Sequence, residues 1–374
     1  MGSIARTCSI AKPYLAVIFL QFGIAGLAII AKFALNHGMN HYTFVFYRHL
    51  VATIVISPFA FVLERNSRPT MTLPIFVKIV MLGLLEPVLD QNLYYAGLKY
   101  TTATFVSALS NIVPALAFLL AWIFRLEKVN IKKVRSLAKV VGTLVTVGGA
   151  TIMTLVKGPV LKLTKGSYHH SSTVSGTLNQ QNPLKGAIMV AAGCVCWAGF
   201  IILQAVTLKS YPAEMSLTAM ICIAGTIEGG LVALAMEWGN TCIWSLHIDS
   251  KLLAYVYSGI VCSGIAYYVQ GVIMKKKGPV FVTAFSPLSM IIVAFIGSIL
   301  LGEQLSLGRI IGAVIIVTGL YAVIWGKNKD QNIPELEMTS DDDRVRTTNS
   351  HNATETTTND PSTYPMVCNN TERV

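Results

Sequence analysis

The chain has 374 residues, of which 53% are hydrophobic and 13% are charged, and its mean hydropathy is +0.59. Soluble domains carry about 25% charged residues, so the composition excludes an ordinary soluble enzyme and a mainly disordered chain. The net charge of +11 divides unevenly, with 24 Lys and Arg against nine Asp and Glu in 1–326 and five against nine in 327–374. The basic excess lies between apolar runs, which indicates membrane topology and not a nucleic-acid surface.

Ten apolar runs follow one another along the chain, each close to the roughly 20 residues that a helix needs to cross a bilayer. They cover 14–34, 44–63, 75–97, 103–124, 138–156, 184–207, 216–236, 252–273, 280–301 and 308–326. The sequence therefore predicts an all-α membrane protein with ten transmembrane helices. With the N-terminus inside, 17 Lys and Arg lie at cytosolic span ends and seven on the opposite side, so both termini are predicted to be cytosolic.

The runs and the polar stretches between them predict five regions. The stretch after the fifth run is rich in Ser, Thr, Gly and Gln, and the C-terminal stretch is rich in Thr, Ser, Asn and Asp. In chain order we expect a cytosolic N-terminus over 1–13, a first five-helix repeat over 14–156, an external linker loop over 157–183, a second five-helix repeat over 184–326 and a disordered cytosolic tail over 327–374.

The two halves share an internal repeat. The stretch Phe105–Ser110 reads Phe-Val-Ser-Ala-Leu-Ser, and Phe281–Ser286 reads Phe-Val-Thr-Ala-Phe-Ser. Glu127 and Glu303 each follow 22 residues after the first Phe of these stretches. A tandem unit of five spans inserts its second copy upside down, and inverted repeats of this kind are typical of secondary transporters with a midplane site between the repeats.

Phe105–Glu127 and Phe281–Glu303 resemble the paired domains of the EamA group in the drug/metabolite transporter superfamily. More specific stretches are Leu20-Gln21-Phe22-Gly23, Asp90-Gln91-Asn92-Leu93-Tyr94-Tyr95, Arg125-Leu126-Glu127-Lys128-Val129 and Lys157-Gly158-Pro159. Together they resemble the plant walls-are-thin-related, nodulin-like family, also called usually-multiple-acids-move-in-and-out transporters, over residues 11–327. The resemblance implies two inverted five-helix EamA-type repeats and a plant carrier that moves amino acids, often outward, across the plasma membrane or the vacuolar membrane. Some relatives are instead associated with auxin.

Three acidic residues fall inside predicted spans, where a charge is costly and marks a pathway by default. They are Glu86, Asp90 and Glu228. Glu86 and Asp90 are four residues apart, so on an α-helix they share a face, which Tyr94 extends. This polar strip is predicted to face the pathway and to meet an ammonium group or a proton. The alternative is a buried structural pair of these acids with a cation from a neighbouring span.

Two such cations, Lys32 and Arg48, lie near the external ends of the first two spans. We expect both to extend to the membrane interface, and the alternative is that they bind a substrate carboxylate. Pro114 and Pro287 are expected to bend their helices. The remaining pathway candidates are polar or aromatic residues at middle depth, each of which also fits a helix-packing role: Gln21, Gln91, Asn92, Trp197, Tyr268 and Gln270, with Asn111, Gln204 and Tyr267 as further ones.

The function predicted from the sequence is facilitative amino-acid transport by alternating access, in the plasma membrane or alternatively the vacuolar membrane. Auxin or another small organic metabolite is the alternative cargo, and a channel-like pore is the alternative class, although no potassium-filter or Asn-Pro-Ala signature occurs. No metalloprotease, hydrolase-nucleophile or P-loop motif occurs, so an enzyme is not expected. The expected partners are an amino acid and the lipid bilayer, with no cofactor, metal or nucleic acid, and the oligomeric state stays open.

Overall fold

A computed structural model describes residues 2–36, 38–100, 106, 109–127, 134–156, 160–161, 183–239, 241–245, 249–300, 305–308 and 310–326. The chain divides into two units, Met1–Gly326 and Lys327–Val374. The tail predicted over 327–374 and most of the linker predicted over 157–183 lie outside the described residues. The description below concerns the first unit.

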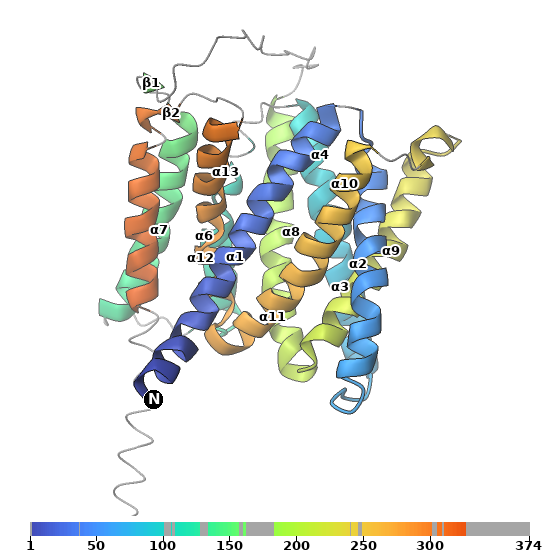
Figure 1. Ribbon diagram of the computed structural model, residues 1–374, viewed down its shortest axis with the longest axis horizontal. Coiled ribbons are helices and arrows are strands. Elements are labelled where there is room, and N and C mark those ends of the chain that lie inside the picture. Colours follow the sequence, from blue (N-terminus) through green and yellow to red (C-terminus); the bar gives the residue numbers. More distant parts are fainter. Residues whose placement is uncertain are drawn as a thin grey trace, which may run out of the picture. The chain divides into compact units, whose positions relative to one another are not determined.

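Helices form nearly all of the described residues in this unit (Figure 1). Those before the linker are α1 (Gly2–Asn36), α2 (His41–Leu63), α3 (Leu73–Gly83), η1 (Leu84–Asp90), α4 (Gln91–Tyr100), α6 (Val113–Ile123) and α7 (Val134–Leu155). Those after it are α8 (Pro183–Ser210), α9 (Glu214–Met236), η2 (Thr241–Trp244), α10 (Ser250–Tyr257), η3 (Ser258–Ile265), α11 (Ala266–Lys277), α12 (Pro279–Ala284), α13 (Ser286–Leu300) and the helix Ile310–Gly326. The two-residue strands β1 (Val160–Leu161) and β2 (Leu305–Ser306) pair antiparallel.

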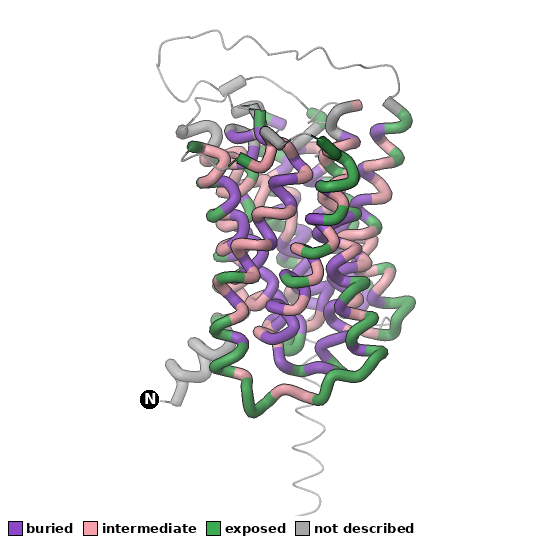
Figure 2. Tube along the Cα trace, turned by 90° about the vertical axis from the view of Figure 1, so that its right-hand side faces the viewer, coloured by how far each residue is buried: buried purple, intermediate pink, exposed green. Residues whose placement is uncertain are grey.

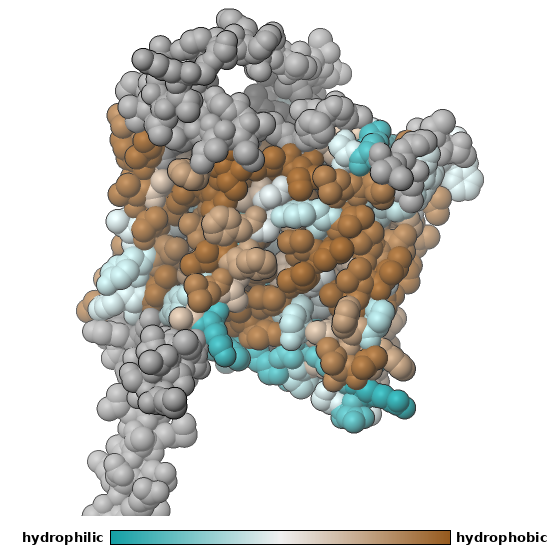
Figure 3. Space-filling view, in the orientation of Figure 1, coloured by the Kyte–Doolittle hydropathy of each residue, from teal (hydrophilic) through white to brown (hydrophobic). Residues whose placement is uncertain are grey.

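Seven helical segments among the described residues are long and apolar enough to cross a membrane. They are Ala11–Ala31, His41–Leu63, Ser136–Met153, Leu184–Ser210, Glu214–Met236, Ser250–Lys277 and Pro279–Ile296, and Val113–Ile123 and Ile310–Gly326 are shorter apolar helices. Large apolar side chains such as Ile54 and Leu231 are 63% exposed on this surface. Figure 3 shows a broad apolar belt on the face in view, with hydrophilic residues at its lower rim. The chain is thus a multi-pass membrane protein, whose exposed apolar surface suits lipid.

Two wide helical turns interrupt the helices that run from Leu73 to Tyr100 and from Ser250 to Lys277. Both η1 and η3 are π-helices, in which the backbone bond spans five residues and not four. Pro87 lies inside η1, and because proline has no N–H it cannot continue the α-helical ladder there. The wide turn of η1 decides which side chains of this span face one another.

Pro114 and Pro287, which were expected to bend their helices, each lie in the first turn of a new helix, just after an interruption of the predicted span. Pro114 is the second residue of α6 and follows a turn at 111–112. Pro287 is likewise the second residue of α13, after the break at Phe285 that ends α12. Each interruption lies before its proline because proline fits the first turn of a helix, where its missing N–H has no intrahelical partner.

Glycines allow α7 and the helix Ile310–Gly326 to pack backbone against backbone, and Figure 1 shows the two side by side. A Cβ placed on Gly142 would lie 2.8 Å from the Gly319 carbonyl oxygen, and one on Gly312 would lie 2.7 Å from that of Gly149. Gly148 has nothing within 4 Å. The hydrophobic effect does not drive helices together in lipid, and small residues of this kind allow the close van der Waals packing that does.

The largest buried cluster lies where α1, α2, α3, α8, α9, α11 and α12 meet, and it includes Phe200, Tyr267 and Phe281. Figure 2 shows buried positions running through the interior of the bundle and exposed positions at its lower end. Polar side chains are embedded in this interior next to Tyr267, and they form the candidate site.

Candidate functional site

Glu86 of η1 is completely buried and faces a cation from α2. Nη2 of Arg48 lies 3.5 Å from Oε1 of Glu86, and Arg48 itself is 4% exposed. Nε2 of His49 lies 3.6 Å from Oε2, and the Tyr267 hydroxyl of α11 donates a hydrogen bond to the same oxygen. A buried carboxylate is tolerated only when it is paired and hydrogen-bonded, so these partners account for an ionised Glu86 in the membrane interior.

Ser263 of η3 completes this network. Its hydroxyl accepts a hydrogen bond from Nε of Arg48 at 2.7 Å and lies 3.4 Å from Nε2 of His49. Nδ1 of His49 donates to the Val45 carbonyl at 2.8 Å, because a carbonyl oxygen can only accept. We call Arg48, His49, Glu86, Gln91, Ser263 and Tyr267 the Glu86 cluster. It joins α2 and η1, from before the linker, to η3 and α11, from after it.

The expectation that Arg48 extends to the membrane interface is wrong. Its side chain points inward from the eighth position of α2 and pairs with Glu86, as the alternative of a structural pair requires. Aliphatic neighbours alone would favour the interface, but a buried carboxylate opposite Arg48 reverses that preference. The Lys32 side chain lies outside the described residues.

The wide turn of η1 changes which residue shares a face with Glu86. Nε2 of Gln91, five residues later, donates to Oε1 of Glu86 at 3.1 Å. In a π-helix, residue i+5 takes the place that i+4 has in an α-helix. The single strip expected for Glu86, Asp90 and Tyr94 is therefore divided: Glu86 is buried, Asp90 is half-buried and Tyr94 is 37% exposed.

Asp90 faces α8. A Cβ placed on Gly193 would lie 3.2 Å from Oδ1 of Asp90, so this glycine lets the carboxylate approach the helix. Within the part of the chain that the structure describes, no cation lies within 4 Å of the Asp90 carboxylate and no hydrogen bond reaches it. Asp90 thus differs from Glu86, whose charge is already matched.

Two amides near these elements also have unmet hydrogen-bonding capacity. Nδ2 of Asn92 donates to the Val88 carbonyl at 2.7 Å, but its Oδ1 is buried with no partner among the described residues. Nδ2 of Asn111 is likewise buried without a partner in the described part of the chain. Asn111 lies two residues after Leu109, whose carbonyl accepts from the Cys194 thiol of α8 at 3.9 Å. Cys194 directly follows Gly193, so the segment that leads into Asn111 and the Asp90 carboxylate both lie against this part of α8.

Gln21 and Trp197 lie in the interior on α1 and α8. Gln21 is 3% exposed, and its Oε1 finds no partner within the described residues. Trp197 is half-buried and stacks on Phe200, with ring centroids 5.7 Å apart. Phe200 in turn lies 5.3 Å from the Tyr267 ring, so an aromatic chain leads from Trp197 to the Glu86 cluster. The structure thus places Trp197 close to the polar interior and within an apolar wall.

Gln270 and Tyr268 lie on α11 beside Tyr267, but no hydrogen bond joins either of them to Glu86 among the described residues. Nε2 of Gln270 donates to Oε1 of Gln204 at 2.8 Å, and Nε2 of Gln204 donates to the Tyr267 carbonyl at 3.3 Å. These bonds hold α8 against α11, which is a packing role. Tyr268 is half-buried, and its neighbour Tyr267 is the tyrosine that reaches Glu86.

Glu228 lies outside the Glu86 cluster, where α9 meets α3. A Cβ placed on Gly83 would lie 3.1 Å from its Oε2, and this oxygen is buried with no partner among the described residues. Ile227 and Leu231 beside it are 59% and 63% exposed. Glu228 is therefore an acid at the edge of the bundle, between packed helices and apolar surface.

His49 and Ser263 are functional candidates that the sequence reasoning missed. A lone His and a lone Ser within apolar spans carry no recognisable pattern. Arg48 signals only its acidic partner Glu86, because an Arg eight residues into an apolar helix requires a counter-charge at the same depth.

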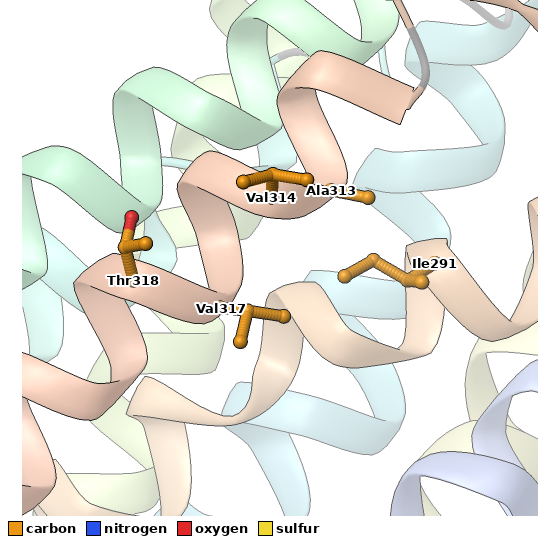
Figure 4. Close-up of a pocket in the computed structure, with 5 residues that line it drawn as sticks. All are labelled: Ile291, Ala313, Val314, Val317 and Thr318. Atoms are coloured by element: carbon orange, nitrogen blue, oxygen red, sulfur yellow. The ribbon is translucent and has the colours of Figure 1, made fainter.

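An apolar groove of about 280 Å³ separates α13 from the helix Ile310–Gly326, and Figure 4 shows Ile291 facing Val314 and Val317 across it. The Thr318 hydroxyl donates to the Ile315 carbonyl at 2.8 Å and so leaves the groove without a polar lining. Val314 and Val317 are more than half exposed on the surface. Such a groove offers nothing to a charged substrate and is distinct from the Glu86 cluster.

The fold and the buried polar cluster are those of a multi-pass transport protein, and comparison with known proteins gives the family. The model of the EamA-like transporter family matches residues 11–155 and again residues 184–325. Three WAT1-related proteins of Arabidopsis thaliana are 62%, 59% and 53% identical over 86% of this chain and 86%, 84% and 87% of their own lengths. The chain therefore belongs to the WAT1-related family of EamA-like transporters, which confirms the resemblance seen in its motifs.

A solved crystal structure of another protein shares the fold. It covers 84% of this chain and 96% of its own, with a TM-score of 0.62 and 16% sequence identity. At that identity the likeness concerns the arrangement of helices alone.

Proposed function

We propose that this transporter carries amino acids across a plant membrane, in a facilitative manner and often in the export direction. Its cycle is alternating access between two inverted five-helix repeats, 14–156 and 184–326, which together supply ten spans. The double match of the family model supports this division. So does the continuity of α3, η1 and α4, which together give one helical segment from Leu73 to Tyr100.

The observation that carries the proposal is the unmatched carboxylate of Asp90 beside α8. An ionised group in the membrane interior is unfavourable without a counter-charge. Glu86 has its counter-charge in Arg48, whereas no described residue supplies one to Asp90 within 4 Å. The ammonium group of an amino acid provides the missing charge and three hydrogen-bond donors.

An amino acid also presents a carboxylate, which needs donors close to the ammonium site. Arg48 is engaged by Glu86 and Ser263, so we assign the carboxylate to a neutral donor. The unpartnered Nδ2 of Asn111, next to the segment that contacts Cys194, fits that role. Trp197 lies on α8, as Cys194 does, and its stacking on Phe200 supports an apolar wall for the side chain of the cargo.

We place the protein in the plasma membrane with both termini in the cytosol, and the vacuolar membrane is the alternative. Lys and Arg at predicted span ends support this orientation, with 17 on the side of the N-terminus and seven on the other.

The test is uptake of labelled glutamine into proteoliposomes, with auxin and a nucleotide sugar as competing cargoes. We expect glutamine to move down its gradient, with Asp90→Asn reducing the rate by at least tenfold and Asp90→Glu keeping part of it. Asp249→Asn is the matched control, since it also removes one charge but Asn still caps α10. Transport of auxin alone, or unchanged glutamine flux in Asp90→Asn, would refute the proposal.

A further inference from the structure

Helices α2 and α9 occupy equivalent places in the two family segments. Each has 23 residues, His41–Leu63 and Glu214–Met236. The segments begin at residues 11 and 184, which are 173 positions apart. The first residues of the two helices, His41 and Glu214, have the same separation, and so do Thr53 and Thr226. These positions are therefore counterparts in the internal repeat.

The hydroxyls of Thr53 and Thr226 lie 3.2 Å apart, so a residue of α2 contacts its own counterpart on α9. Contact between equivalent residues occurs only on the two-fold axis of a self-complementary interface. Glycines let the helices approach: a Cβ on Gly225 would lie 3.2 Å from the His49 ring, and one on Gly230 would lie 3.1 Å from the Phe46 ring. The pair is thus closely packed around the axis.

Glu64 ties the two helices together at one end. It is the C-cap residue of α2, and its carboxylate accepts hydrogen bonds from the backbone N–H groups of Met215 at 3.0 Å and Ser216 at 2.7 Å. These are free N–H groups at the start of α9, where the N-cap residue Ala213 has no side-chain oxygen to accept them. A carboxylate from α2 therefore supplies the cap that α9 lacks.

Glu237 ties them together at the other end. It is the C-cap residue of α9 and the counterpart of Glu64 at the same separation. Its Oε1 accepts a hydrogen bond from Nδ2 of Asn40 at 2.7 Å, and Asn40 caps α2 through the N–H groups of Tyr42 and Thr43. Each helix thus ends on a glutamate that reaches the N-terminus of the other, and both links are present at once.

We propose that α2 and α9 stay joined throughout the transport cycle and form the pivot about which the other helices rock. The proposal rests on the membership of a transporter family and not on the identity of the cargo. When two repeats rock against each other, contacts on the axis that relates them are kept while contacts far from it change. The α2–α9 pair is in contact at its centre, on that axis, and is also tied at both ends.

Cysteine pairs that lock each end provide the test, in a variant whose seven native cysteines are replaced. Glu64→Cys with Ser216→Cys locks one end, and Asn40→Cys with Glu237→Cys locks the other; a short linker that forms a reducible disulfide bond with each cysteine closes each pair. The links replace the contacts that the substitutions remove. Uptake is compared in the same proteoliposomes before linking, after linking and after reduction.

The matched control is a lock across the candidate site. A Cβ on Gly193 would lie 3.7 Å from Cβ of Leu93, a separation that suits a disulfide, so Leu93→Cys with Gly193→Cys joins α4 to α8 beside Asp90. We expect uptake in the locked protein to be at least tenfold lower than in the same variant after reduction. The two α2–α9 locks, singly and together, are expected to change uptake less than twofold.

A tenfold loss on locking either end of α2–α9, reversed by reductant, would overturn the pivot and make that end a gate. Absence of glutamine uptake in the reduced, unlocked protein is a different result and counts against the proposed cargo. Hydrogen exchange tests the pivot independently of any cargo: the amides of 48–58 and 221–231 should exchange more slowly than those of η1 and η3. Equal or faster exchange in the pair would contradict the proposal.

Discussion

Removal of the cation from the Glu86 cluster tests how far that cluster stabilises the membrane domain. Arg48→Met keeps an unbranched apolar stem but removes the guanidinium, and it leaves Glu86 buried without its ion-pair partner at 3.5 Å. Removing one member of a buried pair typically costs about 3–5 kcal/mol. His49, Gln91 and Tyr267 still contact the carboxylate, so we expect the lower end, about 3 kcal/mol.

The second substitution of the cycle neutralises the orphaned charge. In Arg48→Met with Glu86→Gln the new amide can still accept from Tyr267 and carries no charge, so the loss should fall to about 1 kcal/mol. The double variant should therefore be about 2 kcal/mol more stable than Arg48→Met alone, so the two single losses are not additive. Equilibrium unfolding in mixed micelles, at constant detergent composition, measures all four members of the cycle.

The control for this cycle is Lys78→Met, which removes a cation in an exposed contact with the Ser210 hydroxyl. Its effect should stay within about 0.5 kcal/mol. If Arg48→Met lost no more stability than this control, or if the double variant were less stable than Arg48→Met alone, Glu86 would not depend on Arg48 and the ion-pair reasoning would be wrong.

Two further predictions concern packing and hydrogen bonding. Gly142→Leu should destabilise the protein by about 1–3 kcal/mol in the same unfolding assay, because its side chain would meet the backbone of the neighbouring helix. Gly148→Leu is the control and should cause no such loss, because nothing lies within 4 Å of a Cβ at that position. Equal losses of stability for the two variants would contradict the close approach at Gly142. Tyr267→Phe should cost about 1–3 kcal/mol by removing a donor to Glu86, whereas Tyr268→Phe should cost less than about 0.5 kcal/mol. Similar losses for both tyrosines would show that this hydrogen bond is not specific.

The class and family of this protein follow from local properties of the chain. Apolar runs must be long enough to cross a bilayer and must satisfy their backbone within helices, so length and hydropathy suffice to predict a helical membrane protein. The short stretches from Leu20 and from Asp90 identify the family because each is contiguous in the chain. Acids at Glu86, Asp90 and Glu228 stand out for the same reason, since acidic residues are rare within the apolar runs.

The pairing of these residues depends on the tertiary structure. Arg48 and Glu86 lie 38 residues apart, and Glu86 and Tyr267 lie 181 apart, so no local pattern joins them. The π-helix around Pro87 also changes the helical period. With about 3.6 residues per turn, Asp90 would share a face with Glu86, but in the π-helix Gln91 takes that position. Sequence alone thus determined a helical transporter and the few acidic residues within its spans. Only the folded chain decided which charge is neutralised and which is left open, because a side chain's partner is set by the helix packed against it.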